Sequence, residues 1–456
     1  MLLVGACTRL PPFPADGDPV AALDRRVATE VARAGLPGAT FAVLRGGEIV
    51  HLRAHGVADA DHDAALSPHA RMRIASVSKP ITAIALLRLA EQGRLDLDVP
   101  VLEPLAARLP EGFQPHAGFA GLSTRHLLAH CGGFDHGQGP DPMLNARRMG
   151  QRLGVPSPPP VEAIVVWALS RPPDFPPGSR CVYSNLGYAV LGRVIEAVTG
   201  QDYGQAVHAL VLRPAGVPDM RLAASLPAER APDEPRYHDA RMVPSVFDAS
   251  RRVPLPDGGF AIESMDAHGG WLATAAELVR LAEALEGKAD RPLLTAARYR
   301  EMLTPPFPRV PGGRHYALGW DVAHGGYRYW HSGDLPGSTA LLVRERDGTL
   351  WALLANGSVA DARVHERLRR RIGVALRRFQ PRNRKESVAP ANAGTQRLQS
   401  VSMDRRALDA GVRRHDDANV GAIRMLTTFH GSDFPGVSRQ AWRKTRAASR
   451  PVPLIG

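Results

Sequence analysis

Ser76 and Lys79 have the residue types and the spacing of a nucleophile and its base. A hydroxyl and an amine three residues apart at the start of a predicted helix lie on one face and within mutual reach. The helix N-terminus favours an alkoxide there and depresses the pKa of the amine. The alternative for this motif is an N-cap serine followed by a solvated lysine.

The scarcity of lysine strengthens the catalytic interpretation. Of 57 Lys and Arg residues only four are lysine, and Lys79 is one of two in the first 380 residues. An amine can lose its proton near neutrality, whereas a guanidinium cannot. The residues that follow Lys79 are apolar on most sides of the helix, which predicts that the helix is buried in the centre of the domain.

Tyr183 and Asn185 form the single Tyr-x-Asn in the chain, after the Pro-Pro-Gly turn at 176–178. A phenol beside a lysine can share its proton, deprotonate Ser76 and later protonate a leaving group. The amide of Asn185 can hold a substrate carbonyl. The alternative is a packed tyrosine followed by a turn-forming Ser-Asn pair.

His-x-Gly occurs five times, so the pattern is not specific by itself; its histidines are His116, His130, His268, His324 and His331. Only His331-Ser332-Gly333 ends a strand-like run, at 327–330, and leads into Asp334. We predict that the strand edge presents the backbone N–H of Asp334 to an oxyanion.

The predicted elements place these motifs in an α+β fold. Helical periods cover 19–34, 76–92, 162–170, 187–198, 275–285 and 360–379. Strand patterns cover 39–44 and 48–53 around Gly46-Gly47, and then 317–323, 327–331, 339–344 and 350–355. We expect an antiparallel sheet formed from both chain ends, with flanking helices and a helical middle insertion over 100–265.

These three motifs, in this order, resemble the serine β-lactamase and penicillin-binding-protein superfamily, for which S-x-x-K is a signature. The sequence is most similar to the branch with class C β-lactamases, D-alanyl-D-alanine carboxypeptidases and β-lactamase-like esterases. The resemblance spans about residues 17–378 and includes the segments 127–133 and 269–278. It implies a β-lactamase/transpeptidase-like fold.

The resemblance also implies roles. Ser76 would be the nucleophile, and Lys79 and Tyr183 would move the proton. Asn185, His331 and Gly333 would contact the substrate, and the backbone N–H groups of Ser76 and Asp334 would form the oxyanion hole. Each of these residues stands at the matching motif position of this sequence.

Two departures from the family pattern bear on the substrate. Cys131 and Gly132 stand where Thr and Ser are usual, and His331 replaces the Lys that commonly binds a β-lactam carboxylate. A histidine of ordinary pKa is mostly neutral at pH 7. We therefore expect a serine hydrolase that acts through an acyl-serine on an ester, an amide or a D-amino-acid peptide. The alternatives are a class C-like β-lactamase and a catalytically silent relative that binds peptidoglycan peptides or a partner protein.

The amino-acid composition and the distribution of charge exclude several classes of binding partner. Residues 381–456 carry 14 Lys and Arg against 6 Asp and Glu, which leaves 43 against 39 for the rest. A nearly neutral body argues against nucleic-acid binding. Without a zinc-protease motif or a carboxylate cluster we expect no metal and no cofactor, and three cysteines exclude a disulfide framework. We expect a monomer that acts on a small-molecule or short-peptide substrate.

The chain ends suggest three regions. Residues 1–16 resemble the end of a bacterial lipoprotein signal with Cys7 as the lipidation candidate, or else contain a chance Cys in a short apolar start. Residues 17–380 form the hydrolase domain. Residues 381–456 are expected to be a basic, disordered or non-native tail. The lipoprotein interpretation implies a bacterial periplasmic or outer-membrane protein that is attached to the membrane through its lipidated N-terminus.

Overall fold

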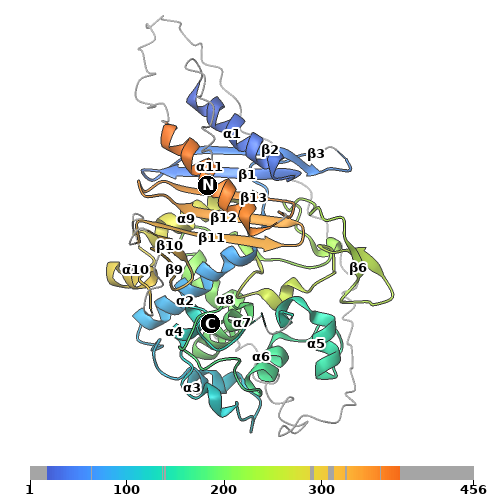
Figure 1. The fold of residues 1–456 in the computed structure, drawn as a ribbon, viewed down its shortest axis with the longest axis vertical. Helices are drawn as coiled ribbons and strands as arrows, with labels where there is room; N and C mark the ends of the chain where they lie inside the picture. The colour runs from blue at the N-terminus through green and yellow to red at the C-terminus, as the bar shows by residue number, and fades with distance from the viewer. Residues whose placement is uncertain are drawn as a thin grey trace, which may run out of the picture. The chain divides into compact units, whose positions relative to one another are not determined.

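The computed structural model describes residues 18–379, except 63, 136, 138–139, 288–291, 307–312, 324–325 and 360. Its centre is an eight-stranded antiparallel sheet in the order β3-β2-β1-β13-β12-β11-β10-β9 (Figure 1). Because β1 (Gly38–Arg45) pairs with β13 (Leu350–Ala355), the two ends of the domain meet inside the sheet. The predicted α+β fold, with one sheet built from both ends, is confirmed.

The remaining strands of this sheet are β2 (Glu48–Asp59), β3 (Ala64–Ala65), β9 (Arg314–Tyr316), β10 (Asp321–Ala323), β11 (Arg328–Leu335) and β12 (Ser338–Arg344). The longer helices are α1 (Pro19–Arg33), α2 (Ser78–Glu91), α5 (Ala146–Leu153), α6 (Val161–Leu169), α7 (Asn185–Thr199), α9 (Ala275–Leu285), α10 (Ala296–Leu303) and α11 (Ala362–Arg378). The shorter ones are α3 (Leu102–Leu105), α4 (Thr124–Leu128) and α8 (Tyr203–Val207), with 3-10 turns that include η1 (Ala75–Val77) and η5 (Pro142–Leu144).

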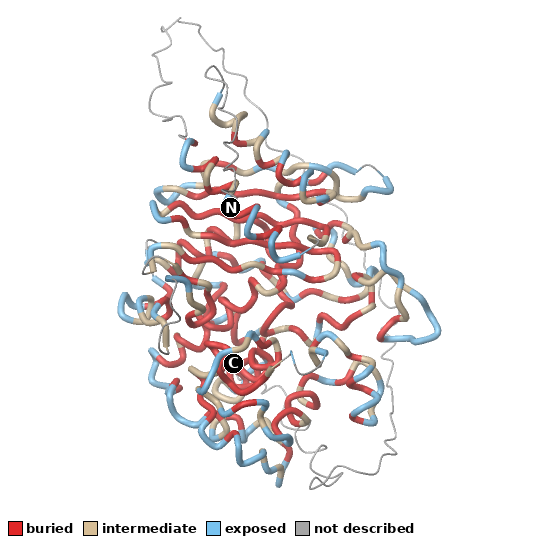
Figure 2. Tube along the Cα trace, in the orientation of Figure 1, coloured by how far each residue is buried: buried red, intermediate tan, exposed pale blue. Residues whose placement is uncertain are grey.

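The central sheet is covered on both faces, as the buried strands of Figure 2 show. Successive side chains of a strand point to opposite faces, so Ala352 and Leu354 belong to one core and Trp351 and Leu353 to the other. The first core includes the apolar residues of α2 and α9, and the second those of α1 and α11. Helix α2, which follows Ser76, therefore packs on one face, and both terminal helices pack on the other.

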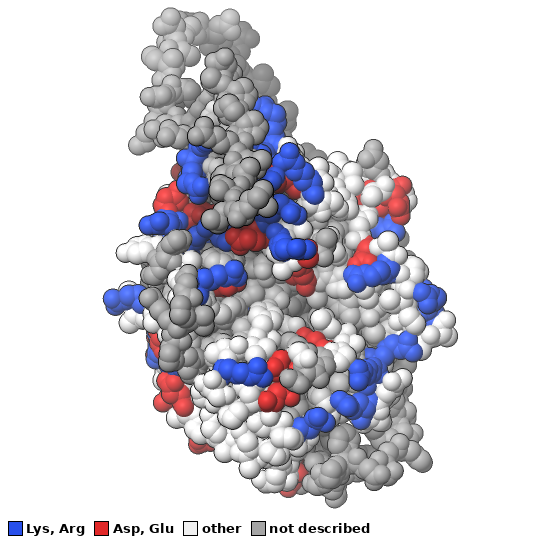
Figure 3. All heavy atoms as spheres, in the orientation of Figure 1, with Lys and Arg blue, Asp and Glu red and all other residues white. Residues whose placement is uncertain are grey.

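The face covered by α1 and α11 carries much of the body's positive charge. Helix α11 has the sequence ARVHERLRRRIGVALRR, and Figure 3 shows Lys and Arg side chains gathered over this layer with acidic residues among them. Because the sheet separates α11 from α2, these arginines are not arranged to bind a substrate near Ser76.

Three details differ from the sequence-based expectation. The middle insertion over 100–265 is not all helical, because it contains β5 (Arg221–Leu222), which joins β4 (Met72–Arg73) and β8 (Trp271–Ala273) in a second sheet. It also contains β6 (Met242–Pro244), which pairs with β7 (Arg252–Pro254). The expected strand 317–323 is reduced to β10. Gly319, with φ +89°, forms a turn there, and a Cβ on it would lie 2.7 Å from Ala83 of α2.

The third difference concerns the third motif. The strand does not end at His331 but continues as β11 to Leu335, because its backbone pairs with β12 as far as Leu335 and Ser338. Pairing with β10 covers only Arg328 to Trp330. In the described part of the chain, the edge of β11 from His331 onward is therefore available to the segment that contains Ser76.

The expected leader with Cys7, the expected tail 381–456 and His324 lie outside the described residues. Within the described residues, no helix has the length and apolar character needed to span a bilayer.

Candidate active site

Ser76 lies in η1, the single 3-10 turn that directly precedes α2. The strand before it is fixed by β8: Met72 pairs with Ala273, and the Ile74 N–H donates to Trp271 O at 3.0 Å. Ala75 then has φ +48°, which is uncommon for a residue with a Cβ and is maintained by the packing around it. This sharp turn presents Ser76 at the start of a buried helix.

Lys79 is fully buried beneath Ser76. Its Nζ lies 3.0 Å from Ser76 Oγ, 2.8 Å from Asn185 Oδ1 and 3.0 Å from the backbone O of His268. Burial holds the pKa of Lys79 well below its ordinary value, and the nearby charge of Asp141 opposes part of this effect. The site thus contains an amine that gives up its proton more readily than a solvated lysine and is in hydrogen-bond contact with a hydroxyl.

Tyr183 reaches the same point from the segment before α7. Its ring centroid is 4.7 Å from Lys79 Nζ, and its hydroxyl shares a hydrogen bond with Ser76. Burial raises the pKa of the phenol above its ordinary value, and the bond to Ser76 opposes the rise. The residue as a whole is 40% exposed. The hydroxyl points into the site while another part of Tyr183 faces solvent.

Asn185 is the first residue of α7 and connects Lys79 to Asp141. Its Oδ1 accepts from Lys79, and its Nδ2 donates to Asp141 Oδ2 at 2.6 Å. Because a carboxylate only accepts, Asp141 sets the amide orientation in which Oδ1 faces the lysine. Sequence reasoning missed Asp141, which caps η5 and carries no recognisable motif.

His331 is nearly buried, and its hydrogen bonds define its tautomer. Nδ1 lies 2.7 Å from Ser332 O, which can only accept, so Nδ1 carries the hydrogen. Nε2 therefore accepts from the hydroxyl of Tyr316 at 2.9 Å. Burial and the field of Lys79 lower the pKa of His331 to about 3. His331 is a neutral residue that is held by Tyr316, which belongs to no recognisable sequence motif.

Gly333 brings β11 against the predicted nucleophile. A Cβ on Gly333 would lie 2.3 Å from the O of Ile74 and 3.0 Å from the N of Ser76. Only glycine permits this approach of two backbones. The next residue, Asp334, lies on the edge of β11 that β10 leaves open. This arrangement suits an oxyanion site formed by the N–H groups of Ser76 and Asp334.

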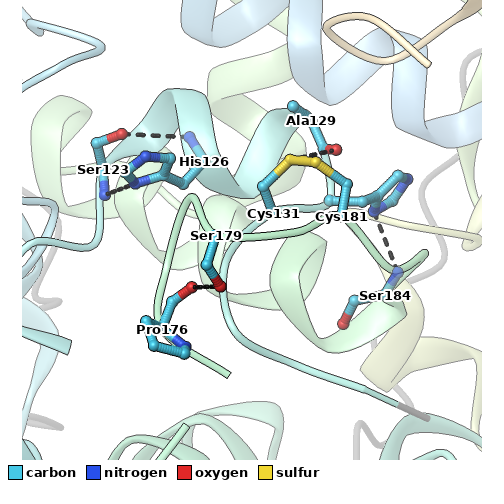
Figure 4. The surroundings of a disulfide bond; sticks show 9 residues. Ser123, His126, Ala129, Cys131, Pro176, Ser179, Cys181 and Ser184 are labelled. Carbon is cyan, nitrogen blue, oxygen red and sulfur yellow. Dashed lines mark hydrogen bonds between the residues drawn. A yellow bond between two sulfur atoms is a disulfide. The ribbon is translucent and has the colours of Figure 1, made fainter. Parts of the chain in front are cut away.

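A disulfide between Cys131 and Cys181 lies beside this site (Figure 4). The small number of cysteines argued against a disulfide framework but did not reveal this single bond. Cys131 follows His130, whose ring centroid is 4.3 Å from that of Tyr183. The segment 127–133, noted in the sequence only for its resemblance, therefore contributes directly to the site.

The structure brings together Ser76, Lys79, Tyr183, Asn185, His331 and Gly333, as the sequence predicted. Of the other His-x-Gly matches, His268 supplies its backbone oxygen to Lys79 and His130 packs on Tyr183. Among the residues that the structure describes, no group of three or more His, Cys, Asp or Glu is arranged to hold a metal ion.

Curated relatives include enzymes and penicillin-binding proteins. The chain is 35% identical over 231 residues to esterase EstB of Burkholderia gladioli, covering 49% of this chain and 56% of that protein. It is 28% identical over 359 residues to penicillin-binding protein 4 of Amycolatopsis lactamdurans, covering 74% and 85%. The chain thus spans little more than half the length of EstB.

Solved structures share the fold. The D-amino acid amidase of Ochrobactrum anthropi SV3 superposes with a TM-score of 0.61 at 24% identity, covering 79% of this chain and 99% of that one. The hydrolase EstCE1 has a TM-score of 0.59 at 20% identity, covering 78% and 98%. The family model described as Beta-lactamase matches residues 23–375, which include every predicted site residue except Cys7. The chain belongs to the Beta-lactamase family.

Proposed function

We propose that this protein is a serine hydrolase that works through an acyl-Ser76 intermediate. The observation that carries the proposal is the 3.0 Å contact between Ser76 Oγ and the buried Nζ of Lys79. Burial favours the neutral amine, which is the form able to accept a proton. The names of the curated relatives, an esterase and a penicillin-binding protein, agree with acyl transfer.

The geometry supports a balanced two-step reaction. Ser76 Oγ attacks the carbonyl carbon while its proton passes to Lys79, with Tyr183 as the partner in the shuttle. The N–H groups of Ser76 and Asp334 would stabilise the oxyanion. The proton then goes to the leaving group as the carbonyl re-forms. Water then attacks the carbonyl carbon of the acyl-Ser76 and gives a proton to the same base. That proton returns to Ser76 Oγ as the acid is released, which restores the hydroxyl.

The charges around the site favour acyl donors without a carboxylate. The charged residues that raise the pKa of Tyr183 are Asp321 and Asp141, and the nearby cation Arg314 is ion-paired with Asp321. His331 is neutral at pH 7 because its pKa is about 3. Lys79 is already bonded to three protein groups. A neutral ester or amide therefore fits the site better than a β-lactam, whose carboxylate needs a cation.

A three-substrate panel tests this function. The chain and its Ser76→Ala variant are assayed with a short-chain nitrophenyl ester, nitrocefin and a D-Ala-D-Ala peptide. We expect turnover of the ester that depends on Ser76 and exceeds turnover of both anionic substrates in kcat/KM. A preference for nitrocefin would instead indicate a class C-like β-lactamase. No turnover and no labelling by a fluorescent phosphonate would indicate a silent relative.

We also propose that the protein works in an oxidising compartment, such as the bacterial periplasm. Disulfides persist there and are rare in the cytosol. The Cys131–Cys181 bond supports this proposal. Fractionation of the native host tests it, because recovery of the protein only from the cytosol with both thiols reduced would contradict it.

A further inference from the structure

We propose that the Cys131–Cys181 disulfide is a positioning element of the active site, which holds Tyr183 against Ser76 through His130. The proposal rests on the proposed function. It predicts that acyl transfer, and not merely stability, depends on the oxidised cysteine pair.

The segment that carries Tyr183 has no regular secondary structure of its own. Residues 180–184 form neither helix nor strand between the turn at 176–179 and the start of α7. Tyr183 is also 40% exposed, so packing encloses only part of it. The position of Tyr183 therefore depends on hydrogen bonds and a covalent bond to a neighbouring segment.

Three hydrogen bonds and the disulfide connect this segment to two residues, His130 and Cys131. The N–H of Gly178 donates to Cys131 O at 2.8 Å, and the N–H of Val182 donates to His130 O at 2.8 Å. The N–H of Ser184 donates to His130 Nδ1 at 3.1 Å. The disulfide adds the covalent tie at Cys181, two residues before Tyr183 (Figure 4).

His130 connects this segment to the reacting groups through contacts of its ring with two tyrosine rings. Its ring is nearly buried and lies 4.3 Å from the Tyr183 ring and 4.4 Å from the Tyr316 ring, measured between centroids. Tyr316 in turn holds His331. His130 thus sits between the tyrosine that bonds to Ser76 and the tyrosine that bonds to the third motif.

The backbone of His130 needs external support. Its φ of +61° is a strained conformation that residues with a side chain keep only when their surroundings impose it. The neighbouring Cys131 is fully buried and covalently tied. Without the bond, His130 and the Tyr183 segment can relax together and move the phenol away from Ser76.

Reduction of the folded enzyme is the test. Cys181 is an exposed residue, from which dithiothreitol is expected to reduce the bond. Dithiothreitol gives two electrons and two protons to form two thiols and becomes a cyclic disulfide itself. We expect kcat for the nitrophenyl ester to fall on the order of tenfold to a hundredfold, as for a displaced catalytic group. KM should change by less than about threefold, because Tyr183 is proposed to act in proton transfer rather than in binding.

Matched variants separate positioning from general stability. Cys131→Ser/Cys181→Ser should show the same loss of kcat and no further response to dithiothreitol, which controls for Cys7. Arg180→Ala removes an exposed ion pair with Asp135 from the same segment and should keep normal kinetics. If the double variant does not fold, the reduced and reoxidised wild-type chain supplies the comparison.

Three results would overturn the proposal. The first is unchanged kcat in protein whose Cys131 and Cys181 are shown by alkylation to be reduced. The second is a loss of kcat that only follows the unfolded fraction measured by circular dichroism. The third is oxidised enzyme without Ser76-dependent turnover, which would refute the proposed function and this inference with it; turnover that survives reduction refutes the inference alone.

Discussion

The Cα of Gly333 packs so closely on the backbone of Ser76 that a Cβ at this position would lie 3.0 Å from the Ser76 nitrogen. The same Cβ would lie 2.3 Å from the O of Ile74. The strand β11 and the turn η1 are thereby held in one fixed relation. The proposed oxyanion site depends on this relation, because its two N–H groups come from these two segments.

Gly333→Ala should therefore reduce activity far more than stability. Accommodating the methyl group costs about 1–3 kcal/mol of the free energy of unfolding, whereas misplacing an oxyanion donor reduces kcat by roughly 10²–10³. The measurements are kcat for the ester and the thermal midpoint. Gly121→Ala is the control, since a Cβ at Gly121 meets no atom within 4 Å. Normal kcat in Gly333→Ala would exclude the proposed oxyanion site.

Lys79→Arg should be nearly as inactive as Lys79→Ala. Arginine keeps a positive charge but cannot release its proton to act as a base, and the buried position has no room for a solvated cation. The measurement is kcat/KM for the ester in both variants. If Arg preserved more than about a tenth of the rate, a barrier change of only about 1.4 kcal/mol, Lys79 would be an electrostatic residue rather than the base.

Asp141→Asn should shift the acid limb of the pH profile to lower pH. The Asp141 charge raises the pKa of Lys79 against the effect of burial, so removing it lowers that pKa further. Activity is lost as pH falls through the Lys79 pKa, because the amine then becomes protonated and cannot act as a base. The profile of kcat/KM measures the shift. The exposed Asp219→Asn is the control, and a limb that moves upward or stays fixed would contradict the assignment.

His331 should produce no limb near pH 6.5 in that profile, because burial and the field of Lys79 lower its pKa to about 3. Tyr316→Phe removes the hydrogen bond to Nε2 and leaves a buried acceptor unsatisfied, at a cost of about 1–3 kcal/mol. We expect a lower thermal midpoint and a modest fall in kcat, since the ring against His130 remains. For His331 itself the measurement is the wild-type pH profile of kcat/KM. A limb near pH 6.5 in that profile would show that His331 titrates there and would contradict this prediction.

The sequence predicted those parts of the molecule that have a local pattern. The periods of α1, α9 and β13 reproduce the observed bounds closely, and the sheet from both chain ends followed from the order of the elements. The three motifs also meet as expected. Each of these features depends on residue spacing within one segment or on a motif of the family.

The rest depends on contacts between distant segments. Asp141 acts on Lys79 through Asn185, and Tyr316 acts through His331, and neither has a motif of its own. The extension of β11 beyond His331 results from pairing with β12. The Cys131–Cys181 bond required knowing that residues 50 positions apart lie together. Sequence periodicity contains no information of this kind.

The identity of the acylated residue tests the central claim most directly. Ser78, the other hydroxyl of the motif, is buried and accepts a hydrogen bond from the N–H of Trp271, so it cannot replace Ser76. The measurement is peptide mass mapping of the chain after reaction with a fluorescent phosphonate, together with ester turnover by Ser76→Ala. We predict one adduct, on Ser76, and a loss of turnover of several orders of magnitude in a variant that remains folded. An adduct on another residue, or unchanged kinetics in Ser76→Ala, would contradict the account.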